Sequence, residues 1–171
     1  EKEDSIDLLE KEKQSFKGCK IGIFHTRWAT HGEKNDNNSH PHIDHKNRIA
    51  LVHNGIIENY DILRSELEIE YGIKSKTETD TEIIVNLISV YYDQIYEETG
   101  NKNMHQAIMK AVSRLTGTWA LVILSLDEPN ALYCARHGSP LLIGIHESYI
   151  MITSEPVSYT HLRAHETLVH L

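Results

Sequence analysis

The chain has 171 residues, 40% of them hydrophobic, which is enough for one domain with its own core. Its formal net charge is −8 and its lysines and arginines are scattered, which argues against a nucleic-acid partner and against an anionic membrane surface. No apolar run approaches the roughly 20 residues of a membrane span, and two distant cysteines favour a reduced, cytoplasmic setting.

The N-terminal third of the chain is expected to hold two strands separated by a polar loop. Residues 1–17 are strongly charged and are expected to form an exposed helix or a frayed end at the edge of the domain. The short apolar stretch 19–28 predicts a buried strand. Residues 32–47 are rich in turn formers and predict a long loop, and the apolar residues 48–57 predict a second strand.

Three helices are expected in the middle of the chain. Helical spacing of apolar residues predicts a helix over 60–71, with Asn59 as its N-cap. A stronger helix is predicted over 79–96, and its threonine and glutamate three positions apart match a capping box. A third amphipathic helix is predicted over 105–117, with Gly117 as its stop signal.

The C-terminal part changes to short apolar segments separated by turn residues, which is typical of strands. Strands are predicted at 118–126, 131–137, 140–146 and 149–155. Residues 158–171 do not continue this pattern and are expected to be a non-native tail, so the domain itself is assigned to residues 18–157.

Histidines crowd the polar loop and its surroundings, and one interpretation is a metal site. His40 and His42 could chelate from one strand, with His31, His45 and His53 near them in sequence. However, no closed cysteine and histidine set at zinc spacing is present, and no H-E-x-x-H motif. Since histidines also serve as hydrogen-bonding scaffolds in polar loops, we predict no metal and no cofactor.

A second interpretation is a site for a small substrate with carboxylate, amine and amide groups. Arg27 offers a planar fork for a carboxylate, and Trp28 offers a flat wall. Thr30 and His31 follow with short polar side chains. The alternative for Arg27 is a surface ion pair, which is worth about 1 kcal/mol at most.

Two further polar clusters allow both a functional and a structural interpretation. The side-chain amide of Asn54 and the backbone N–H of Gly55 can form an oxyanion hole, but Asn-Gly is also a common turn pair. Asp80 stands at the start of a predicted helix, where it could cap the helix or hold a substrate ammonium.

Taken together, the motifs HTRWATHG, SHPH, HNGIIEN and KTETDTE resemble, in this order, the glutaminase domain of glutamine–fructose-6-phosphate aminotransferases. The later stretches RLTGTWALVIL and ARHGSPLLIGI resemble strands of that domain, so the resemblance covers about residues 18–155. It implies an α+β fold of the N-terminal-nucleophile hydrolase type, a four-layer α/β/β/α sandwich of two antiparallel sheets. It also implies a class II glutamine amidotransferase.

The resemblance further implies what such a protein does and with what partners. An N-terminal cysteine hydrolyses L-glutamine, and the ammonia passes to a sugar isomerase domain of the same chain. There it converts fructose 6-phosphate to glucosamine 6-phosphate, for hexosamine biosynthesis. The complete protein is expected to be a cytoplasmic homo-oligomer with no cofactor, no nucleic acid and no membrane as partner.

Roles on the glutamine follow from matching positions of the family motifs. The resemblance implies that Arg27 binds the α-carboxylate, and that a change to alanine mainly weakens glutamine binding. Trp28 becomes a mobile gate over the site and the ammonia path. Thr30 and His31 line the glutamine site, and Asp80 holds the α-ammonium.

The same matching assigns the chemistry of the amide. Asn54 and Gly55 are expected to form the oxyanion hole, which makes them the catalytic residues of this chain. His40 and His53 are expected to support the site rather than to bind a metal.

The chain departs from the family at the nucleophile, because residue 1 is glutamate. Cys19 superficially echoes the family's N-terminal start, but it directly precedes HTRWATHG and is expected in an internal buried strand; Cys134 is expected in a core strand. We therefore expect an N-terminally truncated chain that binds glutamine poorly and does not hydrolyse it. The glutaminase domain of another amidotransferase, a noncatalytic glutamine sensor and a metal-binding module remain alternatives.

Overall fold

The structure, a computed structural model, describes residues 15, 17–26, 35–155 and 167–170. Its centre is an antiparallel sheet of four strands in the order β1-β2-β3-β4. The strands are β1 (His42–Ile43), β2 (Ile49–Ile57), β3 (Gly117–Ser125) and β4 (Tyr133–His137). The long strands β2 and β3 pair over their whole length, from Ile49 opposite Ser125 to Ile57 opposite Gly117.

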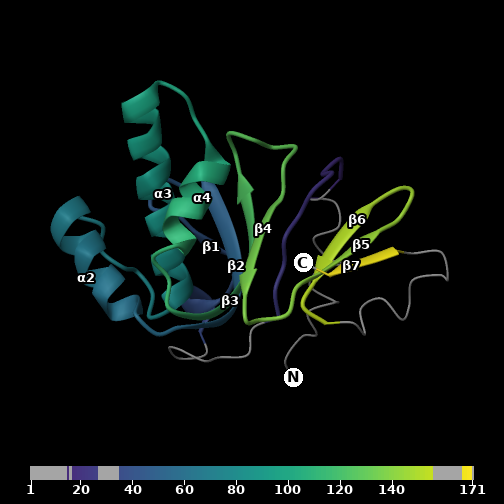
Figure 1. Ribbon diagram of the computed structural model, residues 1–171, viewed down its shortest axis with the longest axis horizontal. Helices are drawn as coiled ribbons and strands as arrows, with labels where there is room; N and C mark the ends of the chain where they lie inside the picture. Colours follow the sequence, from purple (N-terminus) through teal and green to yellow (C-terminus); the bar gives the residue numbers. More distant parts are fainter. Residues whose placement is uncertain (1–14, 16, 27–34, 156–166, 171) are drawn as a thin grey trace.

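Three helices cover one face of this sheet (Figure 1). They are α2 (Tyr60–Tyr71), α3 (Asp80–Thr99) and α4 (Met104–Val112), and a short 3₁₀ helix, η2 (Asp36–Asn38), precedes β1. Helix α3 packs on β1 and β2 and is flanked by α2 and α4, so its first eleven residues are all buried. The core between α3 and the sheet is built mainly of isoleucine and leucine side chains.

A second antiparallel sheet lies on the far side of the first sheet from the helices (Figure 1). It holds three strands in the order β6-β5-β7, namely β5 (Leu142–Ile145), β6 (Ile150–Thr153) and β7 (Thr167–His170). The described residues thus form one helix layer and two antiparallel sheets, which confirms the predicted α+β sandwich class. Among the described helices, none is both long and apolar enough to cross a membrane.

Helix α3 begins where the capping-box pattern predicts. The side chain of Thr79 accepts a hydrogen bond from the backbone N–H of Glu82 at 3.3 Å, which satisfies one donor of the first turn. The reciprocal bond is not made, because the Glu82 carboxylate accepts from the backbone N–H groups of Lys76 and Thr77 instead. The start of α3 is therefore tied to the loop that precedes it, close to the pocket described below.

The prediction of a buried strand over 19–28 is wrong for the part that the structure describes. Residues 19–26 form no strand, Cys19 is exposed, and Phe24 is 64% exposed. A strand needs a neighbouring backbone to bond with, and no described segment supplies one here.

Some other local predictions were also wrong, although α2 has the predicted bounds. Helix α4 ends at Val112, and Gly117 opens β3 instead of closing the helix. Asn59 stands at the N-cap of α2, but its side chain bonds the backbone of Arg114 and Thr116. Strand β1 lies within the predicted loop, and β7 lies within residues 158–171, where no element was expected; the origin of that tail stays a prediction.

Candidate functional site

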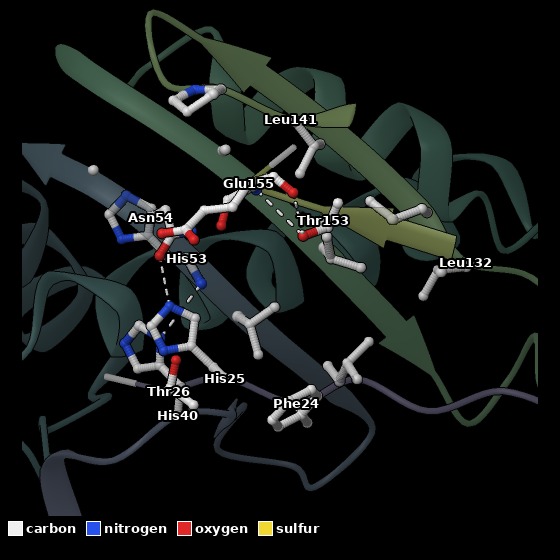
Figure 2. A pocket seen from close by; sticks show the side chains of 18 of the residues that line it. Phe24, His25, Thr26, His40, His53, Asn54, Leu132, Leu141, Thr153 and Glu155 are labelled. Atoms are coloured by element: carbon white, nitrogen blue, oxygen red, sulfur yellow. Dashed lines mark hydrogen bonds between the residues drawn. The ribbon is translucent and has the colours of Figure 1, made fainter. Parts of the chain in front are cut away.

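A cavity of about 880 Å³ opens between the two sheets. It is lined by residues 22–26, by the middle of β2, by the start of α3 and by the segment 149–155. Figure 2 shows the polar side chains of His25, His40, His53 and Asn54 gathered on one side of the cavity, and apolar side chains such as Leu132 and Leu141 on another. Of the sequence-predicted site residues, five line this cavity: His40, His53, Asn54, Gly55 and Asp80.

Asn54 is held by a residue to which the sequence analysis gave no role. Nε2 of His25 lies 2.6 Å from Oδ1 of Asn54, a contact between residues 29 positions apart (Figure 2). Since an amide oxygen only accepts, His25 donates through Nε2–H. His25 opens the motif HTRWATHG, so its position in the motif was the one available signal.

Gly55 occupies a position that only glycine can fill. Its φ of +135° lies in the region that other residues avoid. A Cβ atom there would lie 2.0 Å from the backbone oxygen of Thr118 and 2.7 Å from its carbonyl carbon. The close approach of β2 to β3 at this point therefore requires glycine for steric reasons, whatever its chemical role.

Asp80 is the first residue of α3, and its side chain reaches back to β2. Oδ2 accepts a hydrogen bond from the backbone N–H of Ile57 at 3.0 Å. Oδ1 lies 3.8 Å from Nδ1 of His53, and the carboxylate is almost fully buried. The helix cap is Thr79, so the position of Asp80 is explained by its bond to β2 rather than by capping.

His40 and His53 share a hydroxyl group at the wall of the cavity. Nε2 of His40 and Nδ1 of His53 each lie 3.1 Å from Oγ1 of Thr81 on α3. The backbone N–H of His53 also donates to Nδ1 of His40 at 3.5 Å. These bonds join the loop before β1, strand β2 and helix α3 at one point, so Thr81 is a second residue that sequence reasoning missed.

The remaining histidines of the loop are engaged elsewhere. Nε2 of His42 contacts Oγ1 of Thr79 at 3.0 Å, and the backbone N–H of His45 donates to the side chain of Asn86 at 2.8 Å. Within the described part of the chain, no three histidine, cysteine or acidic side chains are grouped so that they could hold a metal ion. His31 lies outside the described residues, as do Arg27, Trp28 and Thr30.

The two cysteines occupy very different surroundings. Cys19 is exposed, whereas Cys134 lies half-buried in β4 opposite Val122, where burial raises the pKa of its thiol to about 11. The thiolate is the nucleophilic form of cysteine, so a raised pKa makes Cys134 unreactive at neutral pH. Neither cysteine is among the residues that line the cavity.

We expect iodoacetamide at pH 8 to alkylate Cys19 well before Cys134 in the folded protein. With a pKa of about 11, roughly one Cys134 thiol in a thousand is ionised at that pH, and this fraction rises about tenfold per pH unit up to the pKa. Peptide mass spectrometry after timed alkylation measures both sites. Urea-unfolded protein is the control, in which Cys134 should react freely; equal rates in the folded protein would contradict the prediction.

The sandwich of antiparallel sheets, with polar groups in the middle of β2, places the chain in the N-terminal-nucleophile amidotransferase class of folds. Two solved structures share it: glutamine phosphoribosylpyrophosphate amidotransferase from B. subtilis (TM-score 0.64, 25% identity) and an allosteric regulatory enzyme of purine biosynthesis (TM-score 0.65, 26% identity). Each alignment covers 85% of this chain, and 29% and 30% of those chains.

The sequence gives the narrower assignment. Residues 25–160 match the glutamine amidotransferase domain family, and the chain belongs to this family. It is 45% identical over 138 residues to a glutamine–fructose-6-phosphate aminotransferase (isomerizing) of Symbiobacterium thermophilum, and 46% identical over 144 residues to that of Clostridium perfringens. These alignments cover 81% and 84% of this chain but 21% and 22% of the relatives, so the chain spans about a fifth of their length.

Proposed function

We propose that this chain forms the glutamine site of an amidotransferase, in which L-glutamine is hydrolysed and its ammonia is passed to a sugar phosphate. The observation that carries the proposal is that Asn54, Gly55 and the buried carboxylate of Asp80 line one cavity. The named relatives support fructose 6-phosphate as the acceptor and glucosamine 6-phosphate as the product, with an isomerase domain in the complete protein.

The oxyanion hole would be built from the free edge of β2. Backbone N–H groups at His53 and Ile57 point away from β3, since each donates to a side chain on the other side. Because strand N–H groups alternate in direction, we infer that the N–H of Gly55 faces the same edge. The amide of Asn54 adds a second donor, and two donors can stabilise the negative oxygen of the tetrahedral intermediate.

Asp80 would hold the α-ammonium of the substrate. Its carboxylate lines the cavity near its polar side and is oriented by the bond from the N–H of Ile57. A buried carboxylate without a charged partner is energetically costly. A cation beside it offsets part of this cost through electrostatic attraction, so the site favours an ammonium group. Arg27 would complete the recognition by binding the α-carboxylate, with Trp28, Thr30 and His31 around it.

The chemistry would be acyl transfer through a cysteine thiolate. The thiolate attacks the side-chain amide carbon of glutamine, the intermediate expels ammonia, and water hydrolyses the resulting thioester to glutamate. In the family the attacking cysteine is N-terminal and its own amine is the base. We propose that neither Cys19 nor Cys134 has this role, because neither lines the cavity and burial keeps the pKa of Cys134 high.

The first test is a product assay on the complete protein encoded by the gene. Glutamine and fructose 6-phosphate should yield glutamate and glucosamine 6-phosphate in equal amounts, both measured by mass spectrometry. Formation of glutamate without amino sugar would retain the glutaminase and overturn the acceptor. Formation of neither product would overturn the whole proposal.

Asp80→Asn should remove the protein's preference for a substrate that carries an α-amino group. We expect the unchanged protein to use L-glutamine at least about 100-fold better, in kcat/KM, than 4-carbamoylbutanoate, which lacks that amine. In Asp80→Asn this ratio should fall to about threefold or less, since the asparagine oxygen still accepts from Ile57 but carries no charge.

The control for this test is Asp61→Asn, which removes an exposed carboxylate on α2. It should leave the ratio between the two substrates unchanged. Full discrimination in Asp80→Asn would show that another group recognises the ammonium.

A further inference from the structure

We propose that His25 is a positioning residue that sets the orientation of the Asn54 amide and thereby makes it a hydrogen-bond donor to the cavity. The proposal rests on the proposed oxyanion role of Asn54. It adds a residue from a separate segment of the chain, which would act on the reaction through Asn54 rather than by taking part in bond making.

The hydrogen bond between the two side chains determines which end of the amide is free. Oδ1 of Asn54 lies 2.6 Å from Nε2 of His25, so the oxygen is occupied and the Nδ2 hydrogens are turned away from the ring. In the reversed orientation the amide nitrogen would donate to His25, and the oxygen would face the cavity. Two oxygens bearing negative charge repel one another, so the reversed orientation would oppose the oxyanion instead of stabilising it.

The protonation pattern of the His25 ring is restricted by its surroundings. Nδ1 of His25 is buried and has no hydrogen-bond partner within the described part of the chain, whereas Nε2 faces the Asn54 oxygen. A neutral imidazole carries one hydrogen: on Nδ1 that hydrogen would have no acceptor within the described residues, whereas on Nε2 it is donated to Oδ1 of Asn54. The orientation of Asn54 therefore follows from the tautomer of His25.

The His25 ring is itself held in place through a chain of contacts that begins on α3. Its centroid lies 4.4 Å from that of His40, at an interplanar angle of 45° (Figure 2). His40 is fixed by Thr81 Oγ1 at 3.1 Å and by the backbone N–H of His53. Asp80 is the neighbour of Thr81 at the start of α3. The start of this helix therefore supports both the proposed ammonium site and, through His40 and His25, the proposed oxyanion donor Asn54.

Kinetics of the complete protein separate this role from a purely structural one. His25→Phe keeps a ring of similar shape but removes the donor, and we expect kcat for glutamine hydrolysis to fall by about 10- to 100-fold with KM within about threefold. His25→Gln retains an N–H donor and should restore kcat to within about fivefold of the unchanged protein. His105→Leu, which removes an exposed histidine on α4, is the matched control and should have no effect.

The decisive comparison is made in an Asn54→Ala background. If His25 acts through Asn54, adding His25→Phe to that variant should lower kcat by no more than about twofold, because the two changes remove the same interaction. A full additional loss would overturn the proposal and assign His25 a separate structural role. So would a His25→Phe protein with unchanged kcat, or a His25→Gln protein no better than His25→Phe.

A spectroscopic measurement keeps this inference distinct from the proposed function. In ¹⁵N-labelled protein, long-range ¹H–¹⁵N correlation spectra distinguish the Nε2–H from the Nδ1–H tautomer, and loss of signals in His25→Gln assigns the ring. We expect the Nε2–H tautomer, and a shifted Asn54 side-chain amide in His25→Phe. If no glutamine is hydrolysed but this tautomer is found, the proposed function fails while the contact stands; an Nδ1–H tautomer overturns the inference itself.

Discussion

Replacement of Asn54 with alanine is expected to lower kcat for glutamine hydrolysis in the complete protein by about 100- to 1000-fold, with KM within about threefold. The reason is that an oxyanion donor acts on the charge that develops in the transition state and hardly touches the ground-state substrate. Steady-state measurement of glutamate release gives both constants. Loss of glutamine binding with kcat preserved would place Asn54 in substrate recognition instead.

Asn54→Asp separates the loss of the donor from the loss of packing. The aspartate oxygen can still accept from Nε2 of His25, but the side chain offers no N–H group to the cavity. We expect kcat to fall at least as far as in the alanine variant, while the thermal unfolding midpoint stays close to that of the unchanged protein. Asn130→Ala, at an exposed position, is the control. Retention of kcat within about tenfold in Asn54→Asp would contradict the oxyanion role.

Gly55→Ala is expected to destabilise the domain severely. An alanine Cβ would lie 2.0 Å from the Thr118 oxygen, and the φ of +135° is unfavourable for any residue with a side chain. Backbone strain and overpacking each typically cost about 1–3 kcal/mol, so the free energy of unfolding should fall by several kcal/mol. Urea or thermal unfolding followed by circular dichroism measures the loss.

Gly72→Ala is a matched control for Gly55→Ala. Gly72 also has a positive φ, +67°, but no atom lies within 4 Å of its would-be Cβ. It should therefore lose only about 1–2 kcal/mol, the ordinary cost of left-handed backbone. If both alanine variants unfold at the same urea concentration, the steric contact with Thr118 does not lower the free energy of unfolding. In that case β2 relaxes around the added methyl group.

The close approach of β2 to β3 at Gly55 matters both for the stability of the domain and for the proposed chemistry. Gly55 and Gly117 both bring β2 and β3 closer than a side chain would permit, since a Cβ on Gly117 would lie 2.2 Å from the oxygen of Ile56. The two sites lie at the same end of the strand pair, with Ile57 opposite Gly117. A change at Gly55 is therefore expected to affect folding before it affects catalysis.

Much of the fold could be predicted from local sequence patterns. The spacing of apolar residues predicts helix α3, and the capping-box pattern predicts its cap at Thr79. Short apolar runs predict the strands β2 and β3. The stretch 19–26 shows the limit of such patterns, because its apolar residues satisfy the strand pattern while no described strand pairs with it. Pairing depends on a distant backbone, which a local window does not contain.

The sequence by itself determined the family, the α+β class and the residue types of the candidate site, because motifs and hydrophobic periodicity are carried by neighbouring positions. Only the tertiary structure decided that His25 holds Asn54 across 29 positions, and that Thr81 joins His40 to His53. It also decided that the side chain of Asp80 bonds the backbone of β2, and that Gly117 begins a strand. These facts depend on hydrogen bonds and close contacts between distant segments, and such contacts form only once the sheet and helices have packed.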